Sequence, residues 1–214
     1  MTLNETQIQA IDTYLKNSEI EFVDVRMEML DQVASALEHK MKSEKLDFYK
    51  AFKNYMVLHK KQLQKQNKQF TKTTDIKVLK AIGTFTIKPI SLLTFVLCFL
   101  ALKMTSNYID LAPFLKFAPI AFITSIFIFY FSMIFRFGKK ERYSGIERMT
   151  IITSFVTQIL NSFLNPWYGK TLFGDYENLS LLFVSYLLIL GMALVATLLQ
   201  LKKEYTERYT NKLA

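Results

Sequence analysis

Cysteine, histidine and glycine are scarce in this chain, and each scarcity excludes a class of chemistry. The single cysteine, Cys98, cannot form an intrachain disulfide, which excludes a disulfide-stabilised extracellular scaffold. His39 and His59 lie on different expected helices, without a second histidine or cysteine at zinc-ligand spacing. The six glycines form no phosphate-binding loop, and nucleophile-elbow and zincin motifs are absent. We therefore expect a non-enzymatic protein without catalytic residues, metal or cofactor.

Long apolar runs are absent before residue 81, whereas four follow it. A helix that crosses a bilayer needs about 20 mostly apolar residues. None of the four runs contains an aspartate or glutamate, which argues against proton-coupled transport because such transporters relay charge through intramembrane acids. The sequence therefore predicts a multi-pass membrane protein with a soluble head, its four transmembrane helices covering residues 89–104, 117–135, 149–168 and 179–201.

The loops between these runs predict the orientation. Basic residues gather before the first run, between the second and third, and after the fourth, where residues 202–214 form a basic tail. The remaining two loops carry few lysines or arginines. Because Lys and Arg are retained in cytoplasmic loops, both termini are expected in the cytoplasm. An excess of 22 lysines over 5 arginines is typical of AT-rich bacterial genomes, so we expect the bacterial inner membrane. The net charge of +9 is concentrated on these loops, which argues against nucleic-acid binding.

Residues 1–70 predict a head of three helices, so that the whole chain is expected to be all-α. Apolar residues recur at three- and four-residue spacing in each helix. Asn4 or Thr6 is a candidate cap of the first helix, and Asp47 of the third. The second helix carries two adjoining apolar rows, which indicates that it is central to the head or contacts a second subunit.

Arg26 projects from the apolar half of the second helix. It pairs with an acid such as Asp12 or Asp47, or snorkels from the helix start, or marks a contact surface for a partner, because a desolvated guanidinium needs a partner. The opposite face carries an acidic row, which is interpreted as a solvated face, as the contact for a basic protein segment, or as a cation site. The candidate partner-binding residues are thus Arg26, Asp24, Glu28, Asp31 and Glu38.

A basic segment, residues 71–88, joins the head to the first run. Thr74 is a candidate cap for a short helix whose apolar edge (Ile76, Leu79, Ile82) would lie in the membrane interface. Anionic lipids attract such a segment by about 1 kcal/mol per basic residue; simple retention of a basic cytoplasmic linker is the alternative. The candidate lipid contacts are Lys72, Lys77, Lys80 and Lys88.

The third run is half polar. Hydroxyl and amide side chains that face lipid lack hydrogen-bond partners, which costs free energy. This half of the helix is therefore expected to meet other helices, another subunit or water. Interhelical hydrogen bonds and the lining of a cavity or pore both remain open. Possible counterparts in the fourth run are Ser185, Tyr186, Gly191 and Gln200. The polar residues concerned in the third run are Ser154, Thr157, Gln158, Asn161 and Asn165.

The runs Asp24-Val-Arg-Met-Glu-Met-Leu-Asp31 and Leu46-Asp47-Phe-Tyr-Lys-Ala51-Phe52 suggest a family. Over residues 5–60 the chain resembles HAAS domains, helical cytoplasmic modules at the N-termini of small bacterial membrane proteins, some in flavobacteria-like bacteria. The resemblance implies protein–protein interaction and a role in envelope signalling beside PadR-type regulators, with no catalytic residue. A small oligomeric channel or solute-binding membrane protein, its path lined by the third run, is the alternative. Partners expected are membrane lipids and either another protein or further copies of the chain.

Overall fold

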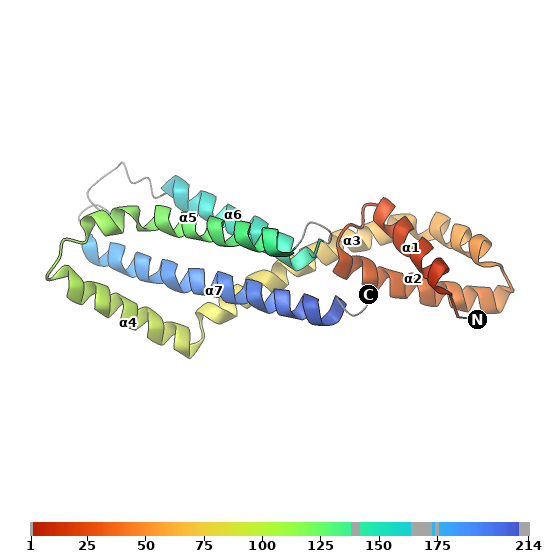
Figure 1. Cartoon of the computed structure of the whole chain (residues 1–214), viewed down its shortest axis with the longest axis horizontal. Coiled ribbons are helices and arrows are strands. Elements are labelled where there is room, and N and C mark those ends of the chain that lie inside the picture. Colours follow the sequence, from red (N-terminus) through yellow and green to blue (C-terminus); the bar gives the residue numbers. More distant parts are fainter. Residues whose placement is uncertain (1, 138–141, 164–172, 174–175, 210–214) are drawn as a thin grey trace. The chain divides into compact units, whose positions relative to one another are not determined.

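The structure is a computed structural model that describes residues 2–137, 142–163, 173 and 176–209, with only the backbone described at 133–137, 159–163 and 209. Within these ranges the chain forms seven α-helices and no β-sheet, which confirms the predicted all-α class (Figure 1). In chain order the helices are α1 (Glu5–Asn17), α2 (Val23–Glu44), α3 (Phe48–Thr86), α4 (Pro89–Ser106), α5 (Ala112–Phe137), α6 (Ser144–Phe163) and α7 (Glu177–Tyr209).

The chain divides into two compact units. The head unit comprises Met1–Ile76, Lys140–Glu147 and Tyr205–Ala214, and the apolar unit comprises Lys77–Lys139 and Arg148–Glu204. The first boundary falls inside α3 and the last inside α7. The head unit therefore contains more than the expected residues 1–70, because two short segments from far along the sequence belong to it.

The core of the head unit forms around α2, as its two apolar rows predict. Seven apolar side chains of α2 are buried, and six of them form one cluster to which α1 and α3 contribute Ile11, Leu15, Phe48 and Ala51. Asn4 caps α1 through a reciprocal pair of hydrogen bonds with Gln7, of 2.9 and 3.0 Å. At the start of α3, the Asp47 carboxylate accepts from the Tyr49 amide at 3.2 Å.

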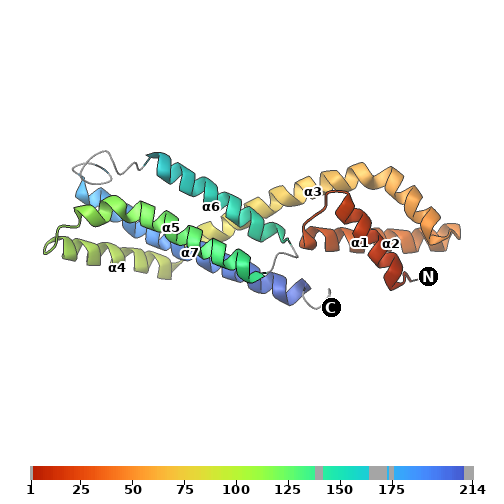
Figure 2. The ribbon, with the colours of Figure 1, turned by 45° about the horizontal axis from the view of Figure 1, so that its top comes forward.

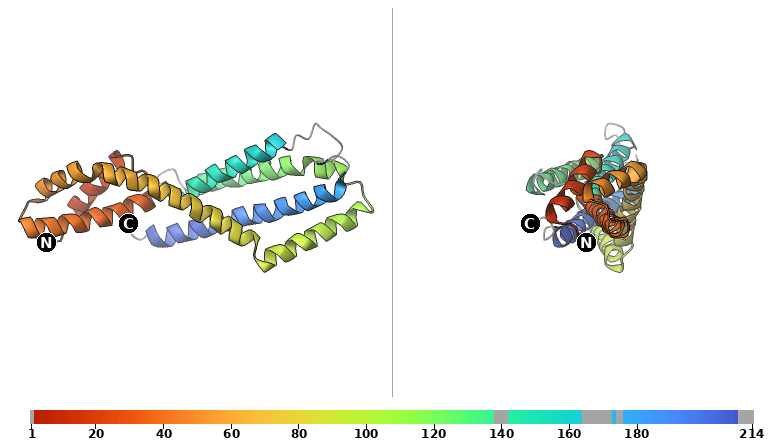
Figure 3. Two further views of the ribbon diagram at one scale, coloured as in Figure 1. Left: turned by 180° about the vertical axis from the view of Figure 1, so that it is seen from behind. Right: turned by 90° about the vertical axis from the view of Figure 1, so that its right-hand side faces the viewer.

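The basic segment is not a separate helix. α3 runs through it without interruption (Figure 3), so the helix start expected at Thr74 is wrong. Thr74 lies inside α3 and its hydroxyl donates to the Phe70 carbonyl at 2.9 Å. Val78, which is buried, continues the inward-facing side of the helix through the basic segment. α3 ends at Thr86, and Pro89 occupies the first position of α4. Proline is tolerated there because the first N–H groups of a helix have no partner within it.

Three helices of the described residues are long and apolar enough to cross a membrane: Pro89–Ser106, Ala112–Ser132 and Glu177–Arg208. They correspond to the first, second and fourth expected runs. The third expected run begins in α6, which is not among the three, and residues 164–168 of that run lie outside the described residues. α7 continues into the expected tail as far as Tyr209.

Within the apolar unit, α7 is the most enclosed of the three long helices. Half of its apolar window is buried, against 28% for α5 and 6% for α4. Leu115 of α5 meets Leu181 and Val184 of α7, with Phe99 of α4 packed against them. α5 and α7 lie side by side in Figures 1 and 2.

Candidate functional site

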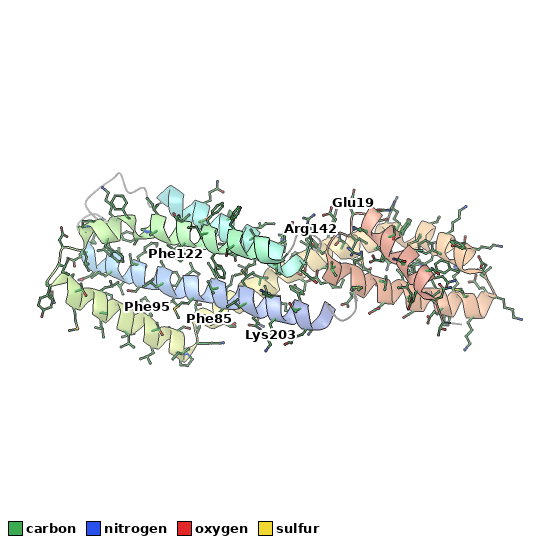
Figure 4. All side chains as sticks on the ribbon, viewed as in Figure 1. Glu19, Phe85, Phe95, Phe122, Arg142 and Lys203 are labelled. Atoms are coloured by element: carbon green, nitrogen blue, oxygen red, sulfur yellow. The ribbon has the colours of Figure 1, made fainter. Side chains whose placement is uncertain are left out.

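The head unit brings the start of α2 against the segment that leads into α6. The Val23 amide donates to the Arg142 carbonyl at 2.9 Å, and Phe22 and Arg142 form an isolated parallel bridge. Arg142 is labelled in Figure 4. The two segments lie about 120 residues apart in sequence, so no local pattern joins them. We call residues 21–24, 142–147 and Tyr205 the docking site.

Asp24 caps α6 from a different helix. One of its carboxylate oxygens accepts from the Ser144 amide at 3.0 Å, and the other accepts from the Ser144 hydroxyl. Ser144 is the first residue of α6 and is 1% exposed. The first amides of a helix have no partner within it, and the helix dipole favours a negative charge there. Asp24 thus satisfies a buried donor at the start of α6.

Arg142 connects two carboxylates in the same place. Its guanidinium contacts Glu21 and Glu147 and lies 5.4 Å from the centre of the Phe22 ring. The hydrogen bond from Arg142 to Glu147 raises the pKa of the guanidinium. Because all three charged groups are about half exposed, each pair contributes only about 0.2–1 kcal/mol. The Asp24–Ser144 contact is therefore the stronger part of the docking site.

The end of α7 completes the docking site. The Tyr205 hydroxyl accepts from the Gly145 amide at 3.1 Å, which satisfies a second amide in the first turn of α6. The ring of Tyr205 stacks on Tyr143, with centroids 4.8 Å apart. From α3, the Thr74 hydroxyl lies 3.5 Å from that of Ser144. Segments from four parts of the chain thus meet around the start of α6.

The two end residues of the predicted acidic row, Asp24 and Glu38, accept hydrogen bonds from backbone amides. Asp24 belongs to the docking site, and Glu38 accepts from the Leu3 amide at 3.0 Å. Glu28 and Asp31 are exposed between them. The expectation of one continuous solvated face is therefore wrong at both ends of the row, where the carboxylates bind backbone amides. Glu28, in the middle of the row, is exposed to solvent.

Arg26 is paired inside the head unit. It is 7% exposed, and its Nε donates to the Asp12 carboxylate at 2.6 Å. Its Nη1 donates to the Glu21 carbonyl at 3.0 Å. The predicted pair with Asp12 is thus confirmed, and Asp47 instead caps α3. The alternative that Arg26 marks a contact surface has no geometric basis, because its guanidinium is buried.

The four candidate lipid lysines are all exposed. Lys77 pairs with Glu204 at 3.2 Å, and Lys88 lies over the Phe85 ring at 5.2 Å. Of the expected apolar edge, Ile76 and Leu79 are 58% and 53% exposed, whereas Ile82 is buried. The exposed apolar edge of α3 therefore contains two of the three expected residues. The other two candidates, Lys72 and Lys80, lie on α3 on either side of Ile76 and Leu79.

The polar half of α6 has two environments. The hydroxyls of Thr153 and of Tyr130 from α5 lie 3.0 Å apart and are both buried, so an interhelical hydrogen bond is present at this level. Next to it, α5 and α6 line an open groove of about 130 Å³, to which α6 contributes Thr150, Thr153, Ser154 and Thr157. Ser154 and Gln158 are exposed. The side chain of Asn161, and the whole of Asn165, lie outside the described residues.

Two of the four expected counterparts in the fourth run, Ser185 and Gly191, have other contacts. The buried Ser185 hydroxyl donates to the Leu181 carbonyl within α7 at 2.8 Å. Gly191 instead admits the Phe122 ring of α5, since a Cβ at this glycine would lie 3.0 Å from the ring (Figure 4 labels Phe122). The hydrogen-bond partner of Thr153 is instead Tyr130 of α5, which no sequence pattern indicates.

Sequence reasoning also missed Ser144 and Tyr205. Ser144 and Glu147 have the Ser-x-x-Glu spacing of a helix start, which is a signal that could have placed the start of α6. Tyr205 gives no such signal. Within the described ranges, no three His, Cys, Asp or Glu side chains gather in a way that could hold a metal ion. Comparison of the chain with protein-family models, curated proteins and solved structures finds no match.

Proposed function

We propose that this chain is a non-enzymatic, multi-pass protein of the bacterial inner membrane, whose helical head mediates protein–protein interaction in envelope signalling or its regulation. The observation that carries the proposal is the docking site. It joins the head to the segment between α5 and α6 and to the end of α7. A soluble head packed on these two segments fits a protein in which all three lie on the same side of a membrane.

This arrangement supports four spans. If the head precedes α4 and residues 142–147 lie on its side, α4 and α5 form one hairpin across the membrane. If Tyr205 lies on that side too, α6 and α7 must form a second hairpin. α6 would then cross despite its polar half. The shared side carries Arg142, Arg148 and the basic residues after α7, which favours the cytoplasm.

Reporter fusions test this topology. A fluorescent protein that folds only in the cytoplasm should be active when fused before Met1 or after Ala214. Alkaline phosphatase, which needs export, should be active when inserted after Tyr108, between α4 and α5. Active phosphatase behind Ala214 would contradict the four-span proposal, and release of the protein by alkaline carbonate would contradict membrane insertion itself.

The interaction role is tested at the middle of the acidic row. Glu28 is exposed on α2 beside the docking site but takes no part in it. A photo-crosslinking residue at position 28 should capture a protein with a basic surface in living cells, and capture should fall in a Glu28→Lys variant. The matched control is Lys53, which is exposed on α3. Equal capture from both positions would contradict a specific partner at the acidic row.

Anionic lipid is proposed as the partner of the exposed lysines of α3. Ile76 and Leu79 would enter the interface while Lys72 and Lys80 meet headgroups. A peptide of residues 57–84 should bind vesicles containing phosphatidylglycerol more tightly than neutral ones. Each Lys→Gln change should weaken binding about fivefold, from about 1 kcal/mol per basic residue. Equal binding to both kinds of vesicle would refute the lipid contact.

A small channel or solute-binding protein is the second candidate. The groove between α5 and α6 favours it, because hydroxyls line one wall and apolar side chains the other. In that case Thr157→Leu should alter solute flux through reconstituted vesicles without changing the amount of folded protein. Unchanged flux in this variant would leave the interaction role as the proposal.

A further inference from the structure

The end of α4 and the start of α7 line an open cavity of about 500 Å³, which we call the α4–α7 cavity. Both helix ends lie at the same end of the apolar unit in Figures 1 and 3. The volume falls within the range of about 300–1,000 Å³ that is usual for small-molecule sites. The lining residues are Lys103, Tyr176, Glu177, Asn178, Leu179 and Leu182.

Two side chains of opposite charge line this cavity without pairing with each other. Lys103 is half-buried in the last turn of α4, and Glu177 is exposed at the first position of α7. Among the described residues, neither the Lys103 ammonium nor the Glu177 carboxylate has a partner in a hydrogen bond or an ion pair. The cavity can therefore bind a negative and a positive group of one ligand at the same time.

An apolar wall continues from the charged residues along α7. Leu179 and Leu182 are 47% and 37% exposed, so both can contact a ligand in the cavity. On the other side, only 6% of the apolar window of α4 is buried, which leaves most of this helix open to hydrocarbon. A ligand that matches the whole cavity thus has a charged end and an apolar end.

We propose that the α4–α7 cavity binds the headgroup of a zwitterionic phospholipid with a primary ammonium, such as phosphatidylethanolamine. The Lys103 ammonium donates to the phosphate, the Glu177 carboxylate accepts from the lipid ammonium, and an acyl chain lies along Leu179 and Leu182. The inference rests on the proposed function, in which α4 ends and α7 begins at the outer face of the membrane. Phospholipid headgroups lie at that depth.

The two charges select this lipid over the other common classes. An anionic headgroup would bind Lys103 but would be repelled by Glu177. A choline headgroup carries a positive charge but no N–H group, so it cannot donate a hydrogen bond to the Glu177 carboxylate. A primary ammonium has three N–H donors. Free phosphate would leave both Glu177 and the leucines without a matching group.

Competition between short-chain lipids on the detergent-solubilised full chain tests the site. The protein is mixed with equal amounts of dioctanoyl phosphatidylethanolamine, phosphatidylglycerol and phosphatidylcholine, and bound lipid is counted by intact-protein mass spectrometry. The first lipid should be bound about fivefold more than either rival, from about 1 kcal/mol for one exposed charged contact. Glu177→Gln should abolish its preference over phosphatidylglycerol. Lys103→Gln should lower the binding of all three lipids about fivefold.

Lys116→Gln is the matched control, because Lys116 is also half-buried, lies in the first turns of α5 and does not line the cavity. This variant should bind all three lipids like the parent. The same losses in Lys116→Gln as in Lys103→Gln, or an unchanged preference in Glu177→Gln, would overturn the proposed site. Equally tight binding of glycerophosphoethanolamine, which has the headgroup without acyl chains, would overturn a lipid as the occupant.

A separate measurement distinguishes failure of this inference from failure of the proposed function. Membranes that contain the parent chain are first extracted with alkaline carbonate, and release of the protein would overturn the proposed function and the inference together. Retention in the membrane, followed by equal binding of the three lipids to the purified parent protein, would overturn the lipid site alone.

Discussion

Replacing Asp24 by alanine should open the docking site. The substitution removes two hydrogen bonds from Ser144, whose amide and hydroxyl are then buried without this acceptor. A hydrogen bond to a charged group contributes about 1.5–3 kcal/mol, and loss of a helix cap costs about 1 kcal/mol. Because these two figures describe overlapping contacts, we expect a cost of about 2–3 kcal/mol. The open population should then rise about 30- to 150-fold.

Hydrogen exchange of the detergent-solubilised protein measures this opening directly. The amides of Ser144 and Gly145 should exchange faster in Asp24→Ala by that factor. Asp24→Asn keeps an acceptor but loses the charge at the helix start, so its effect should be smaller by about 1 kcal/mol. Glu28→Ala, on the same helix but outside the docking site, should leave both amides unchanged.

A double-mutant cycle shows whether Asp24 acts through Ser144. If the two side chains interact, Asp24→Ala should cost less in a Ser144→Ala background than in the parent, with a coupling of about 1 kcal/mol from the hydroxyl bond. Strict additivity, or unchanged exchange of the Ser144 amide in Asp24→Ala, would refute the cap across the two helices.

Three further substitutions test the packing within the two units. Asp12→Ala leaves Arg26 buried with only backbone carbonyls as partners, and should lower head stability by about 2–3 kcal/mol, read as a fall in the thermal midpoint of the detergent-solubilised protein; a smaller loss than in Glu28→Ala would contradict the pair. Gly191→Val should drive a side chain into the Phe122 ring and cost about 1–3 kcal/mol, relieved by Phe122→Leu. Gly83→Ala meets open space and should instead stabilise α3 by about 0.5–1 kcal/mol.

Periodic contacts could be predicted from the sequence, because a helix repeats every 3.6 residues and its buried face repeats with it. The central position of α2 and the pair of Arg26 with Asp12 both followed from this pattern, since a charge in an apolar row needs a nearby acid. The starts of α1 and α3 followed from capping residues. These features depend on residues close in sequence or on adjacent helices.

The docking site could not be predicted in the same way. Asp24 looks like any other acid on a polar face, and its partner lies 120 residues further along the chain. Tyr205 follows an apolar run that already explains its helix. The uninterrupted α3 was missed for a different reason: Thr71, Thr73 and Thr74 have low helix propensity, but each hydroxyl bonds a carbonyl one turn earlier, and packing maintains the helix.

The average hydropathy of α6 describes only part of what decides whether this helix can cross a membrane. A hydropathy average sums all faces of a helix, whereas only the face that meets lipid must be apolar. α6 exposes Ile151 and Phe155, and it places Thr153 against the Tyr130 hydroxyl inside the apolar unit. Its first turn is held by Asp24 and Tyr205 in the head unit. A helix with polar groups matched on one side and an apolar surface on another can cross a membrane at lower cost than its average hydropathy implies. The docking site, rather than the hydropathy of α6, is therefore the stronger argument for a fourth span.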